Sequence, residues 1–435
     1  MESQDNKTCS NKNISDEISQ EMTLPTEKRR AILHCDANCF FASVELLEHP
    51  ELKDKCVAVA GSADERRGII LAKNEAAKKC HVQTAETIWQ AKQKCPELIL
   101  LPPHHGKYTH YSHIINEIYA QYTDRIEPFG IDESWLDVTN SYHLFANSAK
   151  ELGDMLRQRV HAETGLTISV GVSFNKIFAK LGSDYKKPDA TTCINPEDVE
   201  TIVFPQPVEN LLFVGKNALK VLHLLKIYTI GQLASADSEM LARELGKMGV
   251  QISKFAKGQD TSPVRFANDV PQPKSVGNGY TFRRDLLGFD DIKTATTVIC
   301  ENVATRLRKL GLKCTGVQIQ IKDTDLASIT RQKKLPYQTD LARDIKEAVL
   351  DLVRENWNLH QPIRKITVTA QGLTADDEPE QTSLYGDIKR ASPRQEKLER
   401  TLDTIRGKYG RLSVMSANGI KDDLGLSIME SDDEE

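Results

Sequence analysis

Two short stretches, AILHCDANCFF at residues 31–41 and IEPFGIDESWLDVT at residues 126–139, decide how this sequence is interpreted. Each places acidic residues at the end or at the turn of an apolar strand pattern. Asp36 lies near the end of the first strand, and Asp132 and Glu133 lie at the tip of a predicted hairpin. A folded sheet can bring these three carboxylates to one point, where they repel one another unless a cation neutralises them.

The residue types at this point indicate a metal-dependent reaction. Oxygen ligands select hard ions such as magnesium or manganese, and two such ions around phosphate oxygens are a common means of in-line phosphoryl transfer. A lone Asp at a strand end is more often a turn or helix cap, but the adjacent pair Asp132 and Glu133 between two apolar runs is harder to explain in that way. The pattern therefore predicts phosphoryl or nucleotidyl transfer.

Composition sets the broad class of the protein. The chain has 435 residues, which is too long for one typical core, so several domains are expected. Its hydrophobic content of 39% and charged content of 27% are typical of a soluble globular protein. The sequence contains neither an apolar run of membrane-spanning length nor a secretory signal, so we expect no membrane association and a cytoplasmic location. The nine cysteines are scattered and none forms a C-x-x-C pair, so zinc and dithiol interpretations are only weakly supported.

The charge is unevenly distributed along the chain. The net charge is -5, yet residues 271–372 carry about +6 and residues 374–435 about -6 by counting Lys and Arg against Asp and Glu. A basic module beside an acidic tail fits a protein that partly faces nucleic acid. Lysines on a solvated helix face would produce the same numbers, so the charge alone does not decide between these interpretations.

The expected fold is α+β with several domains. Residues 1–30 are polar and are predicted to be a disordered extension. Strands mixed with helices over residues 31–206 indicate a sheet domain, and residues 207–270 are predicted to be mainly short helices. Over residues 271–372 the expected order is β-α-β-β-α-β, which is a split βαβ module, and residues 373–435 form a polar tail.

The sequence resembles the Y-family translesion DNA polymerases of the bacterial DNA polymerase IV type. The resemblance runs from about residue 31 to 385. It rests on four sequence segments whose order and spacing are specific to the family, although each segment alone is only a weak signal. The segments that carry it are HCDANCFFASVE at 34–45, LAKNEAAKK at 71–79, IDESWLD at 131–137 and SVGVSFNKIFAK at 169–180.

The resemblance implies a right-handed polymerase that acts as a monomer. Residues 31–206 would form palm and fingers, residues 207–270 the thumb, and residues 271–372 the little finger that tracks DNA. The implied activity is template-directed addition of dNTPs to a primer 3′-hydroxyl by two Mg²⁺ ions, with Mn²⁺ as a substitute. Family membership also implies translesion synthesis in DNA repair and damage tolerance, low fidelity and no proofreading.

The resemblance also implies roles for particular residues near the acids. Asp36 and Asp132 would hold the metal ions, Glu133 would complete the site and assist attack by the primer hydroxyl, and Ala37 would add a backbone carbonyl ligand. Phe41 would lie against the sugar of the incoming nucleotide, where a flat ring leaves no space for a 2′-hydroxyl. Ordinary core packing is the expectation for Phe40, whereas the motif position favours the nucleotide role over core packing for Phe41.

Two lysines are expected to bind the triphosphate. Lys187 matches a family lysine with that role, and Lys78 lies where many members carry arginine for the same purpose. The chain departs from the common pattern at Glu75, where an aromatic residue often occurs three positions before that arginine. Lysine also lacks the bidentate fork of arginine, and Lys73 and Asn74 are the alternative residues for the triphosphate contacts of the fingers.

DNA and a sliding clamp are the expected macromolecular partners. Gln381, Leu384 and Tyr385 lie in QTSLY, which resembles the peptide by which bacterial polymerases dock on the clamp. Primer–template DNA would be held mainly through its phosphates, with little dependence on base sequence. The candidate cations in the basic module are Lys274, Arg283, Arg284, Arg331, Lys333 and Lys334.

Two other function classes remain as alternatives. A nucleotide cyclase or another palm-type nucleotidyl transferase also uses paired acids, but it has no need of a basic split βαβ module and a clamp-like peptide. A catalytically inactive scaffold that binds DNA or the clamp would have no need of Asp36, Asp132 and Glu133 together.

Overall fold

The computed structural model describes residues 29–62, 66, 68–376, 378, 393–410, 413–415 and 423–426. The expected N-terminal extension up to residue 28 and the clamp-like peptide at 381–385 lie outside these residues. The chain forms two compact units, the first from Met1–Asp36, Ile118–Val160 and Thr167–Phe266, and the second from Ala37–Glu117, His161–Leu166 and Ala267–Glu435. The domain boundaries proposed from the sequence stay predictions.

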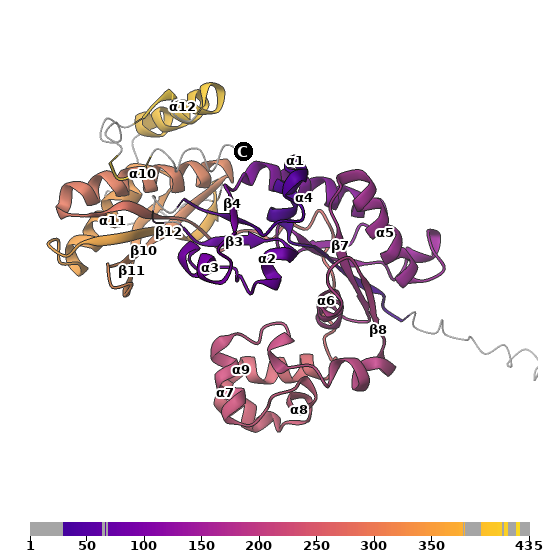
Figure 1. The fold of residues 1–435 in the computed structure, drawn as a ribbon. Coiled ribbons are helices and arrows are strands. Elements are labelled where there is room, and N and C mark those ends of the chain that lie inside the picture. The colour runs from indigo at the N-terminus through magenta and orange to yellow at the C-terminus, as the bar shows by residue number, and fades with distance from the viewer. Residues whose placement is uncertain are drawn as a thin grey trace, which may run out of the picture. The chain divides into compact units, whose positions relative to one another are not determined.

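A five-stranded sheet forms the centre of the first unit (Figure 1). Strands β1 and β7 are buried along their whole length, as expected for near-continuous apolar runs covered on both faces. β1 pairs with β6 in antiparallel register, so that Asp36 lies opposite Glu133, whereas β7 and β8 are parallel. The strand order is β5 (Ile126–Pro128), β6 (Glu133–Asp137), β1 (Ile32–Ala37), β7 (Ile168–Ser173) and β8 (Thr191–Ile194).

Helix α6 (Lys176–Tyr185) packs closely on β7 and β8 of this sheet. Asn175 caps its start by accepting a hydrogen bond from the backbone N–H of Phe178. A Cβ atom at Gly171 would lie only 1.9 Å from the carbonyl oxygen of Ala179, so glycine is what allows the helix to approach the strand. The other long helix of this region is α5 (Ala149–Thr164).

The remainder of the first unit is helical, as expected from the sequence. Its helices are α7 (Lys216–Leu224), α8 (Ile230–Ser235) and α9 (Ser238–Ala256). Their apolar faces share a core that includes Leu222, Leu233 and Ile252. Short 3₁₀ or π turns occur in the two units at Pro50–Leu52, Tyr142–Leu144, Pro196–Asp198, Val199–Val203 and Val208–Asn210.

A small three-stranded sheet belongs to the second unit. Its order is β3 (Ile70–Lys73), β2 (Val57–Ala60) and β4 (Ile99–Leu101). The helices that follow or precede these strands are α1 (Phe40–Glu48), α2 (Glu75–Lys79), α3 (Ile88–Lys94) and α4 (His105–Ala120). Half of the side chains in the core of this part are alanine, and the core consists of Ala58, Ala60, Ile70, Ala77, Val82, Ala91, Cys95 and Leu98.

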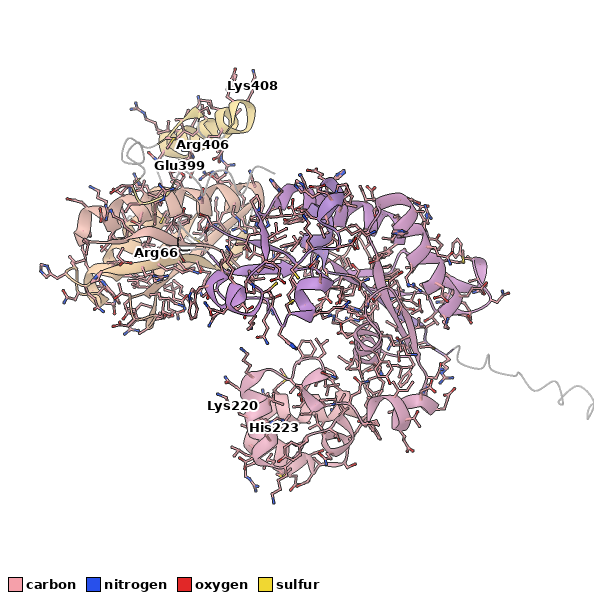
Figure 2. All side chains as sticks on the ribbon, viewed as in Figure 1. Arg66, Lys220, His223, Glu399, Arg406 and Lys408 are labelled. Carbon is pink, nitrogen blue, oxygen red and sulfur yellow. The ribbon has the colours of Figure 1, made fainter. Side chains whose placement is uncertain are left out.

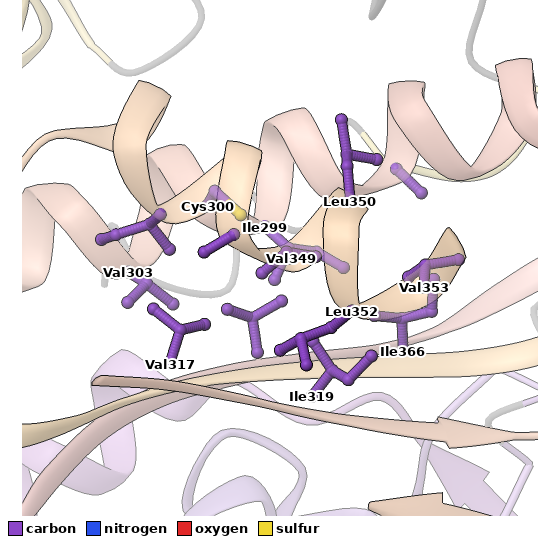
Figure 3. Close-up of a cluster of buried hydrophobic side chains, with 14 of the residues drawn as sticks. Ile299, Cys300, Val303, Val317, Ile319, Val349, Leu350, Leu352, Val353 and Ile366 are labelled. Atoms are coloured by element: carbon purple, nitrogen blue, oxygen red, sulfur yellow. The ribbon is translucent and has the colours of Figure 1, made fainter. Parts of the chain in front are cut away.

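The predicted split βαβ module is confirmed. In chain order it contains β9 (Ser275–Leu286), α10 (Gly288–Lys309), β10 (Leu312–Lys322), β11 (Ser328–Thr339), α11 (Ala342–Asn356) and β12 (Ile363–Ala375). The sheet order is β11-β10-β12-β9, and all three of its strand pairings are antiparallel. Both helices pack on one face, where residues such as Val303, Val317 and Val349 form a continuous core (Figure 3).

Segments that follow β12 in the sequence also pack on this module. Helix α12 (Pro393–Tyr409) contacts α10 through the buried guanidinium of Arg308, whose Nη1 lies 2.7 Å from Glu399 Oε2. Glu399 and Arg406 extend from α12 on its α10 side, whereas Lys408 points away (Figure 2). Leu424 accepts a hydrogen bond from the backbone N–H of Arg283. Of the helices in the described ranges, none is both apolar enough and long enough to cross a bilayer.

Candidate active site

The carboxylates of Asp36 and Glu133 face each other across the pairing of β1 and β6. The side chains are largely buried, with exposed fractions of 11% for Asp36 and 17% for Glu133. Asp132 is the last residue of the turn between β5 and β6, and that turn is closed by hydrogen bonds from the N–H groups of Phe129 and Gly130 to the Glu133 carbonyl. The hairpin with acids at its tip, expected from the sequence, is therefore confirmed.

Two lysine ammonium groups contact these acids, and that of Lys180 lies between them. Lys180 Nζ is 2.8 Å from Asp36 Oδ2 and 2.7 Å from Glu133 Oε2, and Lys187 Nζ is 2.7 Å from Asp36 Oδ1. Asp184 contacts both lysines, at 3.3 Å from Lys180 and 2.7 Å from Lys187. The carboxylates thus converge on positive charge, as closely spaced acids must if they are to remain ionised.

The pKa shifts describe the same electrostatic balance. Burial alone would lower the pKa of Lys180, but the charges of Asp36 and Asp184 outweigh burial and raise it. Burial would raise the pKa of Glu133, but hydrogen bonds from His34 and Lys180 prevail and lower it to about 2. Asp132 has no such partner, and burial followed by the charges of Asp36 and Glu133 raises its pKa. Asp132 therefore lies in an excess negative field that a cation would relieve.

His34 is a member of the site that sequence reasoning did not single out. Its ring is fully buried, its Nδ1 lies 2.8 Å from Ser183 Oγ, and its Nε2 lies 3.4 Å from Glu133 Oε2. Burial lowers the pKa of His34. His34, Asp36 and Glu133 each offer a ligand atom within 4.8 Å of the others, whereas Asp132 lies outside this tight group.

Lys180 and Asp184 were also missed, although their spacing carried a signal. They are four residues apart in α6 and therefore lie on one face of the helix. Lys187 lies three residues after Asp184 and belongs to the same charged patch. Sequence reasoning assigned a role to Lys187 alone, because helix spacing does not reveal that this face turns toward the end of β1.

The donor set fits divalent cations of the hard class. Carboxylate oxygens dominate it, and His34 has one nitrogen directed toward Glu133. The ammonium group of Lys180 shows that positive charge is stable between the carboxylates of Asp36 and Glu133. Ala37, expected to offer its carbonyl, is the last residue of β1, directly after Asp36.

Phe41 lies in a cluster of aromatic rings in the second unit. Its ring stacks on that of Tyr108 with centroids 4.0 Å apart and an interplanar angle of 10°. Phe41 is half-buried, whereas its neighbour Phe40 is only 3% exposed and packs as a core residue. Tyr108 is fixed in turn by donating its hydroxyl hydrogen to Glu45. The ring of Phe41 is therefore held rigidly while one part of it stays accessible.

Lys78 and Glu75 are partners on the short helix α2. Lys78 Nζ lies 3.4 Å from Glu75 Oε1, and the same carboxylate oxygen accepts a hydrogen bond from the Cys39 thiol at 3.3 Å. The side chain of Lys78 remains 53% exposed. Asn74, named as a possible substitute in phosphate binding, instead caps α2 and bonds the backbone of Val57 and Lys55.

Several of the candidate DNA-binding cations in the split βαβ module already have anionic or polar partners. Arg284 bridges Asp291 and Asp423, each at 2.6 Å, and Lys333 lies 2.9 Å from Asp351. Arg331 donates to the side-chain oxygen of Asn356. Of these three side chains, the guanidinium of Arg284 is the most strongly engaged.

Comparison with known proteins gives concordant matches over most of the chain. The profile described as "impB/mucB/samB family" matches residues 35–184, and the profile of the C-terminal domain of that family matches residues 273–384. A DNA polymerase IV of Acetivibrio thermocellus is 46% identical over 388 residues, which cover 89% of this chain and 96% of that protein. A DNA polymerase IV of Clostridium kluyveri is 36% identical, with coverage of 90% and 98%.

A solved structure shows the same fold. It is a Y-family DNA polymerase chimera built from Dbh and Dpo4, with a TM-score of 0.71 and 23% sequence identity. The match covers 79% of this chain and 99% of the chimera.

Proposed function

This chain belongs to the impB/mucB/samB family of Y-family DNA polymerases, of the bacterial DNA polymerase IV type, and we propose how its residues perform that activity. It is a DNA-directed DNA polymerase that acts in translesion synthesis, with DNA and dNTPs as substrates, and it depends on metal ions. The α+β polymerase fold expected from the sequence is confirmed, and the cyclase and scaffold alternatives are excluded by this membership.

We assign metal binding to the carboxylate centre, which we define as Asp36, Asp132 and Glu133 with the Ala37 carbonyl. Two Mg²⁺ ions, for which Mn²⁺ could substitute, would be held there and would supply positive charge to the primer hydroxyl and the departing pyrophosphate. The single observation that carries this assignment is the convergence of Asp36 and Glu133 on the ammonium group of Lys180.

The protein's own charges prepare the site for this chemistry. Because Lys180 and His34 hold the pKa of Glu133 at about 2, the carboxylate is ionised at neutral pH and can accept a hydrogen bond from the primer hydroxyl. His34 is a positioning residue in this scheme, since Ser183 fixes its ring and Nε2 faces Glu133. Lys187 is 24% exposed, so its ammonium can exchange Asp36 for triphosphate oxygens when a nucleotide enters.

The fingers residues have proposed roles in nucleotide selection. Phe41, held flat by Tyr108, would exclude a 2′-hydroxyl from the sugar site. Lys78 would release Glu75 and bind the triphosphate as a point charge. Replacing Phe41 with the smaller Val is expected to raise ribonucleotide incorporation relative to dNTP incorporation, which primer extension with each nucleotide class measures directly.

The remaining partner assignments are also proposals. Gln381, Leu384 and Tyr385 would bind a sliding clamp, and cations of the split βαβ module would bind duplex phosphates. We further propose a monomer that works in the bacterial cytoplasm, where its DNA substrate is found, with low fidelity and without proofreading.

Primer extension with an Asp132→Asn variant tests the catalytic assignment. We expect loss of Mg²⁺-dependent incorporation with unchanged affinity for primer–template DNA, because the substitution removes one ligand charge and preserves shape. Asp124→Asn is the matched control, since Asp124 is an exposed acid of the same unit and should not affect extension. Unchanged extension by the Asp132→Asn variant would show that the carboxylate centre is assigned wrongly.

A further inference from the structure

A second group of ligand-bearing side chains lies in the second unit, at one end of the small sheet β3-β2-β4. Three thiols and one carboxylate offer ligand atoms that all lie within 4.8 Å of one another. We call the group the cysteine cluster, and it consists of Cys56, Cys80, Cys95 and Glu97. Its members are separated by 24, 15 and 2 positions in the sequence, a spacing that matches none of the zinc patterns expected from C-x-x-C pairs.

Each cysteine is placed by the end of a different element. Cys56 directly precedes β2, Cys80 is the C-cap of α2, and Cys95 is the C-cap of α3. The backbone fixes these ends together, because Ile99 donates its N–H to the Cys56 carbonyl and Leu98 donates to the Cys95 carbonyl. The thiols are thus held by β2, β4 and two helix ends rather than by one flexible loop.

The distances fit a shared metal ion better than a disulfide. Zn–S bonds of about 2.3 Å in a tetrahedral site place sulfur atoms roughly 3.8 Å apart. Cys56 Sγ lies 3.7 Å from Cys80 Sγ, and it lies 3.9 Å from Glu97 Oε1. A disulfide requires about 2.05 Å and would use only two of the three thiols. The described cysteines are free thiols in this structure.

The surroundings of the cysteine cluster give an ion access from solvent. Glu97 is exposed and Cys56 and Cys80 are half-buried, so an ion can enter, whereas Cys95 is buried and anchors the group to the core.

The part of the fold around the cluster has little apolar volume to stabilise it. Four of the eight side chains in its core are alanine, and the partly buried residues that complete this core include Cys56 and Cys80 themselves. Small modules with thin cores commonly gain stability from a structural metal ion. A cross-link that joins the start of β2 to the ends of α2 and α3 would serve this purpose.

We propose that the cysteine cluster is a structural site for one divalent ion of the zinc class, with three thiolates and the Glu97 carboxylate as ligands. The site is separate from the carboxylate centre in ligand type, because thiolate ligands select zinc-like ions and all-oxygen ligands select magnesium-like ions. Binding would release the thiol protons to solvent and convert the three thiols to metal-bound thiolates.

Cobalt substitution of the full-length protein tests the proposal. Protein stripped by a chelator under reducing, anaerobic conditions would be titrated with Co²⁺, which gives an intense near-ultraviolet charge-transfer band only when thiolates bind it. We expect one equivalent of Co²⁺ to produce that band and Zn²⁺ to displace it. Cys80→Ser should remove the band, and Glu97→Gln, an exposed change that preserves folding, should weaken retention of the ion.

Two control variants keep the outcome interpretable. Cys193→Ser alters a half-buried cysteine outside the cluster, and Asp132→Asn alters the carboxylate centre, so the band should survive in both. Zinc should also protect three thiols of the wild-type chain from alkylation, which reports on the cluster even if the Cys80→Ser variant does not fold. Absence of the band in folded wild-type protein, or a Cys56–Cys80 disulfide that forms in its place, would overturn the proposal.

Discussion

The carboxylate centre and the cysteine cluster gather potential metal ligands in opposite ways. In the carboxylate centre, Asp36 and Glu133 are both paired with Lys180, and Asp36 is also paired with Lys187. In the cysteine cluster the ligands are thiols that interact with one another, as the contact between Cys56 and Cys80 shows. The difference teaches that grouped carboxylates need cationic partners close by, whereas grouped thiols can bond to one another without them.

The two regions also differ in protonation. The pKa of Glu133 is lowered to about 2, so this carboxylate has no proton to lose when a cation binds to it near neutral pH. Burial raises the pKa of Cys95, with further contributions from Cys56 and Cys80, so binding at the cysteine cluster has to displace protons. Metal affinity should therefore depend on pH much more steeply at the cysteine cluster than at the carboxylate centre.

The largest effect is expected from Asp36→Asn. Asp36 contacts both Lys180 and Lys187, so the substitution removes a ligand charge and the counter-charge of two cations. Primer extension should fall by on the order of a thousandfold or more, which is the size of loss seen when a preorganised electrostatic group is removed. The thiolate–cobalt band of the same variant should be unchanged. A parallel loss of that band would mean that the two regions are not independent.

A smaller effect is expected from Lys187→Met. Hydrogen bonds to charged groups contribute about 1.5–3 kcal/mol, which corresponds to roughly a tenfold to hundredfold rise in the KM for dNTP. Single-nucleotide incorporation at varied dNTP concentration measures this change. Lys186→Met is the matched control, because Lys186 is the exposed neighbour of Lys187 in the sequence and should leave KM as it was. Equal effects in the two variants would contradict the role given to Lys187.

Zinc should stabilise the wild-type chain but not a Cys95→Ala variant. An ion present at about a hundred times its Kd adds about 2.7 kcal/mol to the folded state, which raises Tm by several degrees. Differential scanning calorimetry with Zn²⁺ or with chelator measures the shift. Any stabilisation by Mg²⁺ through the carboxylate centre should be equal in the two chains, and a Zn²⁺ response of undiminished size in the Cys95→Ala variant would place the ion elsewhere.

The smallest effect is a difference in acid stability between wild type and Glu133→Gln. Because the folded pKa of Glu133 is lowered from 4.5 to about 2, its stabilisation is fully present above pH 4.5 and is lost as pH falls toward 2. The wild type should therefore exceed the variant in stability at pH 7, and the gap should close over that window. Denaturant unfolding at several pH values measures the gap, and a constant gap would refute this coupling.

The sequence predicted the parts of the molecule that depend on local pattern. The acids of the hairpin, the helices of residues 207–270 and the β-α-β-β-α-β order follow from apolar periodicity and turn residues. His34 escaped notice because a buried histidine in an apolar strand is usually a core residue. Lys180 escaped because its partner Asp36 is 144 positions away, and only the pairing of the sheet and α6 brings them together.

The cysteine cluster could not have been predicted from local pattern at all. Cys56, Cys80 and Cys95 lie at the ends of three elements, and their convergence depends on which strands pair and how α2 and α3 end. A metal pattern is recognisable in sequence when a single turn holds two ligands, as in C-x-x-C. Here the only neighbouring pair is Cys95 and Glu97, which is too common a combination to indicate a metal.

The packing of Leu424 and Leu426 into the module that begins at β9 has a consequence for biosynthesis. Both side chains are buried in the same core as Val276 and Phe282, and Leu424 bonds the backbone of Arg283. This core stays incomplete until residue 426 has left the ribosome, which at bacterial rates is on the order of ten seconds after β9 emerges. During that interval the nascent module lacks part of its interior, so premature termination upstream of residue 424 would release a chain prone to proteolysis.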